Sequence, residues 1–101
     1  ILGAGAWGTT LASLAAANGH HVQVRSRRDR AISSREIERA DVVVSAVSMP
    51  GVATVVREIQ TLSLLPTTIF VTATKGLDPV TTLTPAQIWQ AAFPDRSVVV
   101  L

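Results

Sequence analysis

The order of apolar and polar residues along the chain predicts strands and helices in alternation. Runs of consecutive apolar residues are typical of strands covered on both faces, whereas apolar positions three and four residues apart are typical of helices. The predicted strands cover Ile1-Leu2 and residues 21–25, 42–47, 68–73 and 97–101. The predicted helices cover residues 9–18, 33–40, 52–62 and 84–92. This βαβαβαβαβ order predicts an α/β fold, a doubly wound (Rossmann-like) parallel sheet with helices on both faces.

Short motifs mark where several of these elements begin and end. Pro50-Gly51 is expected to break the chain after the strand over 42–47. Ser33 with Glu36, and Thr84 with Gln87, have the spacing of capping boxes, in which two side chains satisfy free N–H groups at a helix start. Pro85 suits the first position of the last helix, where no backbone donor is needed.

Composition narrows the class of protein further. The chain has 101 residues, which is one domain at most, and its formal net charge of +2 is too small for a general nucleic-acid binder. It has no cysteine, which excludes disulfides, thiol nucleophiles and Cys-ligated zinc and agrees with a reducing, cytoplasmic location. No apolar run approaches the ~18 residues of a membrane span. The adjacent His20 and His21 cannot both face one metal ion from a strand, so we expect no metal site.

A glycine motif lies between the first strand and the first helix, in the sequence Gly3-Ala4-Gly5-Ala6-Trp7-Gly8. In a βαβ unit the first glycine permits a tight turn, the second lets the backbone approach a pyrophosphate, and the third lets the helix pack closely. Free N–H groups at the start of the helix would then face the phosphates. A plain glycine-rich turn is the alternative, but the position in the βαβ unit favours a dinucleotide site.

The residues after the second strand indicate which dinucleotide is preferred. NAD sites usually carry an acid about 20 residues past the glycines, which holds the ribose 2′-hydroxyl. Here that stretch is Arg25-Ser26-Arg27-Arg28, and guanidinium groups bind a 2′-phosphate well. The sequence therefore favours NADP, although each of these arginines taken singly could be a solvated loop residue.

Other candidates lie at the carboxyl ends of the predicted strands. Trp7 could form a wall of the cofactor pocket or pack under the helix. Ser45 and Ser48 lie near the switch point of the sheet, where ligands bind, but a helix-capping role is the simpler interpretation. Lys75, the only lysine, follows the strand over 68–73 and precedes Gly76, so its ammonium could bind a substrate phosphate or polarise a carbonyl. It is also the one candidate for a proton donor.

The combination of these motifs closely resembles bacterial, and in particular cyanobacterial, NAD(P)-dependent glycerol-3-phosphate dehydrogenase. The resemblance covers the whole chain and rests on four stretches: Gly3–Ala12 (GAGAWGTTLA), Asn18-Gly19-His20, Thr74-Lys75-Gly76-Leu77, and Thr84–Gln90 (TPAQIWQ). It implies that residues 1–101 are part of an NAD(P)-binding Rossmann-like domain, truncated at both ends. A helical C-terminal domain, absent here, would carry the catalytic lysine beyond Leu101.

The resemblance also implies an activity. Enzymes of this family interconvert dihydroxyacetone phosphate and sn-glycerol 3-phosphate by hydride transfer, for phospholipid synthesis. We expect NADPH as cofactor, with NADH possible, a cytoplasmic location, a homodimer for the full-length enzyme, and no activity for these 101 residues alone. The cofactor contacts that it implies are Gly3, Gly5, Ala6, Trp7, Gly8, Arg27, Arg28 and Lys75, and Lys75 would also contact the substrate.

Some positions depart from the family pattern. Many members have serine where Ala6 stands, and Val-Pro-Ser where this chain has Val47-Ser48-Met49-Pro50. Two alternatives therefore stay open: the cofactor domain of another NADP-dependent reductase, and a dinucleotide-sensing module without catalysis.

Overall fold

The computed structural model describes residues 1–26 and 34–101. Its helices are α1 (Ala6–Ala17), α2 (Ser34–Glu38), α3 (Met49–Gln60) and α4 (Pro85–Ala92). Its strands are β1 (Val42–Ser45), β2 (Ile69–Thr72) and β3 (Val98–Val100). The alternation of strands and helices, and with it the predicted α/β class, is confirmed.

The three strands form a parallel sheet in the order β1-β2-β3, in which Val43 pairs with Phe70 and Phe70 with Val98. The first residues extend this sheet beyond β1. Leu2 forms parallel bridges to Arg25 on one side and to Ser45 on the other. Both neighbours of the first strand are therefore parallel to it, as in a doubly wound sheet.

The strand predicted over 21–25 is reduced to this single bridge at Arg25. Its backbone N–H donates to the Ile1 carbonyl at 2.8 Å, and its carbonyl accepts from the Gly3 N–H at 2.8 Å. These two bonds flank the bridge between Arg25 and Leu2, and within the described residues no second bridge extends the ladder.

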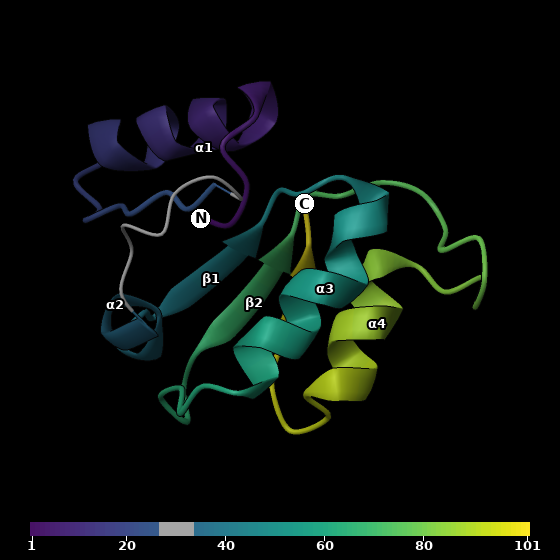
Figure 1. Cartoon of the computed structure of the whole chain (residues 1–101). Helices are drawn as coiled ribbons and strands as arrows, with labels where there is room; N and C mark the ends of the chain where they lie inside the picture. Colours follow the sequence, from purple (N-terminus) through teal and green to yellow (C-terminus); the bar gives the residue numbers. More distant parts are fainter. Residues whose placement is uncertain (27–33) are drawn as a thin grey trace.

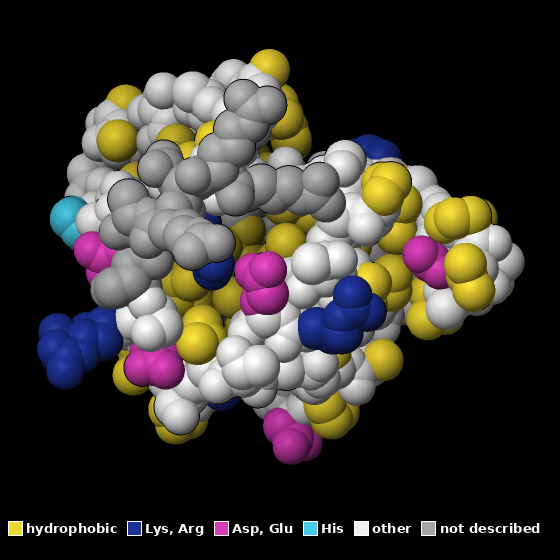
Figure 2. All heavy atoms as spheres, viewed as in Figure 1, with side chains coloured by type: hydrophobic (Ala, Val, Ile, Leu, Met, Phe, Trp, Pro, Cys, Tyr) yellow, Lys and Arg dark blue, Asp and Glu magenta, His cyan; other side chains and the backbone are white. Residues whose placement is uncertain are grey.

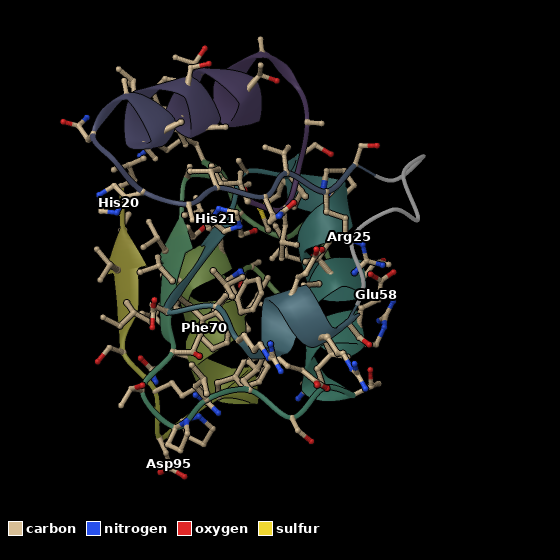
Figure 3. The ribbon with its side chains drawn as sticks, turned by 90° about the vertical axis from the view of Figure 1, so that its left-hand side faces the viewer. His20, His21, Arg25, Glu58, Phe70 and Asp95 are labelled. Atoms are coloured by element: carbon tan, nitrogen blue, oxygen red, sulfur yellow. The ribbon has the colours of Figure 1, made fainter. Side chains whose placement is uncertain are left out.

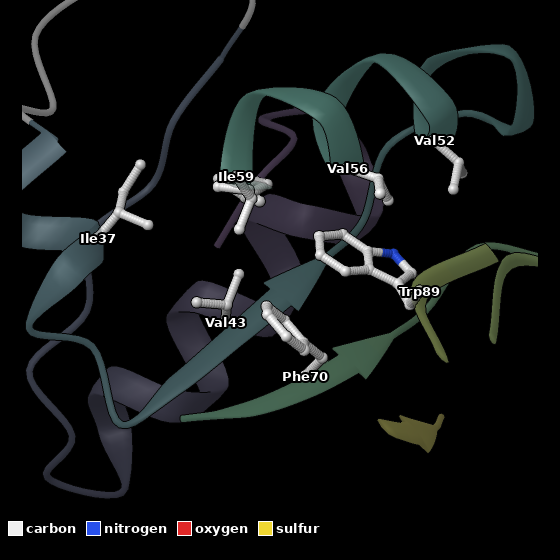
Figure 4. Close-up of a cluster of buried hydrophobic side chains, with 8 residues drawn as sticks. Ile37, Val43, Val52, Val56, Ile59, Phe70 and Trp89 are labelled. Carbon is white, nitrogen blue, oxygen red and sulfur yellow. The ribbon is translucent and has the colours of Figure 1, made fainter. Parts of the chain in front are cut away.

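The helices lie on both faces of the sheet. In Figure 1, α1 lies on one side, over the N-terminal segments, while α3 and α4 cover the other side. The core lies between the sheet and α3 with α4, and Figure 4 shows Phe70 and Trp89 at its centre. These two rings stack with centroids 4.7 Å apart, and Phe93 adds a third ring at 4.6 Å from Phe70.

Within the described residues, helices cover one face of the sheet more completely than the other. Val42, Ile69 and Val99 are 47%, 38% and 47% exposed, whereas Val43 and Phe70, which point to the opposite face, are buried. The cause is the side on which each helix packs. Helices α3 and α4 lie on the face of Phe70, and α1 lies over the N-terminal segments of the other face.

Two helix starts differ from the sequence prediction, and one agrees closely. Helix α1 begins at Ala6 rather than Thr9, and α3 contains Pro50 and Gly51 in its first turn rather than starting after them. Proline is tolerated there because the first N–H groups of a helix have no intrahelical acceptor. The capping box of α4 is confirmed: Gln87 N–H donates to Thr84 Oγ1 at 3.2 Å, and Thr84 N–H to Gln87 Oε1 at 2.8 Å. Ser33, the other predicted cap, lies outside the described residues.

Candidate cofactor site

A cavity of about 620 Å³ lies at the carboxyl ends of the first strand and β1. The glycine loop, the loop after β1 and one side of α3 form its walls, and Arg25 and Ser26 line its edge. The lining residues are Leu2, Gly3, Ala4, Gly5, Arg25, Ser26, Ala46, Val47, Ser48, Gly51, Thr54, Val55, Glu58 and Ile59. This is the switch point of the sheet, because α1 leaves the first strand on one face and α3 leaves β1 on the other.

Gly3 and Gly8 are required by the protein's own packing. Gly3 has a φ of +107°, and a Cβ there would lie 2.6 Å from the Ala46 carbonyl oxygen. A Cβ on Gly8 would lie 2.0 Å from the Gly3 carbonyl oxygen. The loop after the first strand, the start of α1 and the loop after β1 are thus in close backbone contact, as the sequence predicted for the first and third glycines.

Gly5 is different, because the protein itself gives no reason for a glycine there. Its φ of −73° is accessible to any residue, and a Cβ at this position would meet no atom of residues 1–26 or 34–101 within 4 Å. Gly5 lines the cavity and is the N-cap of α1. The space next to it is therefore open to a ligand that must approach the backbone closely.

The first turn of α1 presents backbone donors next to Gly5. The first intrahelical hydrogen bond is from Thr9 N–H to the Gly5 carbonyl at 2.9 Å. The N–H groups of Ala6, Trp7 and Gly8 precede it and have no acceptor within the helix. Donors in this arrangement, at the positive end of a helix dipole, bind phosphate groups.

One ion pair lies at the edge of the cavity. The Arg25 guanidinium is 3.5 Å from the Glu58 carboxylate. Figure 3 shows the two side chains facing each other, Arg25 from the end of the 21–25 segment and Glu58 from α3. Arg27 and Arg28, the other predicted phosphate ligands, lie outside the described residues. His20 and His21 are exposed and lie apart from this pair.

Of the candidates Ser45, Ser48 and Trp7, only Ser48 lines the cavity. Ser48 lines the cavity and stands at the N-cap position of α3 without a capping hydrogen bond from its side chain, so the helix does not use its hydroxyl. Ser45 is buried and does not line the cavity; its Oγ has no hydrogen-bond partner within the described part of the chain. Trp7 is 53% exposed in the first turn of α1, so it is not packed beneath the helix, and it does not line the cavity either.

Lys75 lies at the same edge of the sheet but outside the cavity. Thr74 donates from its hydroxyl to the Val47 carbonyl at 2.6 Å, which ties the loop after β2 to the loop after β1. The Lys75 ammonium donates to the Leu101 carbonyl at 2.5 Å, beside the end of β3. Gly76 follows with a φ of +115°, a backbone conformation that favours glycine.

The loop beyond Lys75 is ordered by Asp78. Its carboxylate accepts hydrogen bonds from Thr81 N–H at 2.7 Å, from the Thr81 hydroxyl at 2.8 Å and from Val80 N–H at 3.2 Å. The bond from the Thr81 backbone is the main reason that the pKa of this exposed carboxyl is lowered. Asp78 therefore has a local structural role.

Sequence reasoning missed the wall that α3 contributes. Thr54 and Val55 each lie three or four residues from Gly51 and from Glu58, so all four fall on one side of α3, next to its buried stripe. That spacing is visible in the sequence, but only the packing of α3 shows that this side borders the glycine loop.

These features define a class of protein. A parallel α/β sheet with a glycine loop, free helix N–H groups and a cavity at its switch point is the arrangement of Rossmann-like nucleotide-binding folds. Within the described residues there is no cluster of three potential metal ligands, and none of the helices described has the length and apolar character to cross a membrane.

Sequence comparisons show which known proteins the chain is similar to. Residues 1–37 match the family model described as NAD-dependent glycerol-3-phosphate dehydrogenase N-terminus. All 101 residues align with enzymes named glycerol-3-phosphate dehydrogenase [NAD(P)+]: 57% are identical in the one from Trichormus variabilis, 58% in Nostoc sp. and 52% in Synechococcus sp. strain JA-3-3Ab. The chain is therefore similar in sequence to the cyanobacterial enzymes of this name, which is the resemblance that the motifs predicted. The chain spans about a third of the length of each of these curated relatives. No solved structure matches it.

Proposed function

We propose that this chain is the dinucleotide-binding part of an oxidoreductase, with NADPH as its cofactor and NADH as a second one. The observation that carries the proposal is Gly5, a cavity-lining glycine that the fold itself does not require. A pyrophosphate that approaches the backbone at this point explains the glycine. The similarity of the whole chain to enzymes whose names include NAD(P)+ supports the same cofactors.

We assign each group of candidate residues to one part of the dinucleotide. Gly3 and Gly5 would border the pyrophosphate, and Ala6, Trp7 and Gly8 would contact it through their backbone N–H groups at the start of α1. Arg27 and Arg28 would meet the adenosine end, where a 2′-phosphate needs positive charge. Ser48, whose hydroxyl is not used by α3, adds a hydrogen-bonding group to the cavity.

The reaction we propose is the interconversion of dihydroxyacetone phosphate and sn-glycerol 3-phosphate, a step toward phospholipids. The bound cofactor supplies the hydride for this chemistry. Lys75 would contact both cofactor and substrate: it lies at the carboxyl edge of the sheet, on a loop that Thr74 ties to the switch point. Its ammonium could neutralise a substrate phosphate or polarise a carbonyl. We further propose a cytoplasmic enzyme that acts as a homodimer.

The test is to follow oxidation of NADPH, and separately of NADH, by the protein in its natural full length with dihydroxyacetone phosphate as the sole acceptor. We expect oxidation that depends on the acceptor and is faster with NADPH. If the protein binds NADPH but does not oxidise it with this acceptor, the substrate assignment is wrong and another reductase or a sensor is indicated. If it binds neither dinucleotide, the cofactor assignment is wrong as well.

A further inference from the structure

The adenosine end of the cavity contains a carboxylate that the sequence does not show near the glycine motif. The stretch about 20 residues after the glycines, where NAD sites carry an acid, begins here with Arg25. In the structure an acid stands at this place nevertheless, because Glu58 of α3 approaches Arg25 from across the cavity. Two residues of opposite charge therefore lie next to each other at this edge of the cavity.

Both partners are held at fixed points. The Arg25 backbone is bonded on both sides to the first strand, through Ile1 and Gly3, so its side chain starts directly beside the glycine loop. Glu58 precedes Ile59, which is fully buried in the core, and this packing sets the orientation of the last turn of α3. The side chains can move, but their attachment points cannot separate without disturbing the fold.

The pair itself is easily exchanged. The two charged groups are 3.5 Å apart, and their side chains are 33% and 52% exposed. Exposed ion pairs of this kind contribute little to stability, because water and salt screen them. A 2′-phosphate, which carries more charge than a carboxylate and matches the guanidinium fork, would compete well for Arg25.

We propose that Glu58 is a specificity-determining residue that competes with the 2′-phosphate of NADPH for Arg25. With NADPH bound, Arg25 turns from Glu58 to the phosphate, and the carboxylate that is left behind repels the same phosphate. With NADH bound, no phosphate competes, and the Arg25–Glu58 pair persists. Glu58 thus reduces the preference for NADPH and keeps NADH usable. This inference rests on the proposed dinucleotide function.

The experiment measures the dissociation constants of NADPH and NADH from the fluorescence of the reduced nicotinamide, with the protein in its natural full length. Glu58→Gln removes the charge and keeps the shape. We expect it to tighten NADPH about tenfold and to change NADH less than about twofold, since only NADPH carries the repelled charge. Asp95→Asn is the matched control: it makes the same change of charge at a residue far from the pair in Figure 3, and should leave both constants unchanged.

A second variant separates competition for Arg25 from a general effect of charge. In Arg25→Gln the binding of NADPH should weaken, and adding Glu58→Gln should then improve it by clearly less than in the wild type. An equal improvement in both backgrounds, an unchanged ratio of the two constants, or weaker NADPH binding in Glu58→Gln overturns the inference. If the wild type binds neither dinucleotide, the proposed function fails first. Thermal denaturation of each variant shows whether it is folded.

Discussion

A different physical reason favours glycine at each of the three glycine positions of the loop. Gly3 is in a left-handed conformation against the Ala46 carbonyl, Gly8 leaves no space for a Cβ beside the Gly3 carbonyl, and Gly5 borders open space. The sequence motif alone treats them as one pattern. The structure separates the two that hold the fold together from the one left open to a ligand, and the two kinds can be tested separately.

Gly8→Ala should destabilise the protein strongly. The added methyl would lie 2.0 Å from a backbone oxygen, so α1 must shift away from the first strand. We expect the free energy of unfolding to fall by about 2–3 kcal/mol, at the upper end for overpacking a tight contact. Gly5→Ala, with an ordinary φ and no neighbour, should cost less than about 1 kcal/mol, the cost of a poorer N-cap. Chemical denaturation measures both, and equal losses would contradict this division of roles.

At the scale of elements, the start of α4 can be tested as a self-contained device. Thr84 and Gln87 satisfy each other's backbone N–H groups, and Trp89 then places its ring in the core. Thr84→Ala removes one of the two bonds and should lower the free energy of unfolding by about 1 kcal/mol. Thr67→Ala, at an exposed threonine in the loop before β2, is the matched control and should change it by less than about 0.5 kcal/mol. Similar losses in thermal denaturation would show that the capping box does not stabilise the helix.

Elements with a local cause were predictable, and those that depend on partners were not. The capping box of α4 and the left-handed Gly3 and Gly76 follow from short-range chemistry that the sequence displays. The strand over 21–25 has the right alternation, but a ladder also needs a paired neighbour, and within the described residues its pairing is a single bridge between Arg25 and Leu2. The position of the Glu58 carboxylate beside Arg25 depends on the packing of α3 against the sheet. No local pattern encodes that contact.

On the scale of the whole molecule, the sheet is asymmetric. One face carries α3, α4 and the core, whereas Val42, Ile69 and Val99 of the other face are partly exposed. In Figure 2, which views the molecule as in Figure 1, hydrophobic side chains also line a hollow on the surface. Apolar side chains that are adjacent on an open sheet face favour association with other apolar surfaces.

A protein consisting of residues 1–101 should therefore self-associate. Replacing Val42, Ile69 and Val99 together by threonine keeps the β-branched shape and removes apolar surface, so it should lower the association measured by analytical ultracentrifugation. We expect about a tenfold weaker association, since three partly exposed side chains lose apolar contact area of the order that the transfer free energy describes. Val80→Thr, at a loop residue that is 88% exposed, is the control and should have no effect. Association that is unchanged in the triple variant would show that the open face does not cause it.

The central claim is that a dinucleotide binds where Gly5 leaves the loop open, and one titration tests it most directly. Gly5→Asp places a good N-cap residue and a negative charge at the start of α1, which should leave stability unchanged or raise it by about 0.5–1 kcal/mol. The same charge would repel the pyrophosphate, so NADPH and NADH should each bind at least about a hundredfold more weakly than to the wild type. Ser13→Asp, two turns further along α1 at an exposed position, carries the same charge and should bind both normally. A Gly5→Asp protein that binds NADPH as tightly as the wild type would contradict the account.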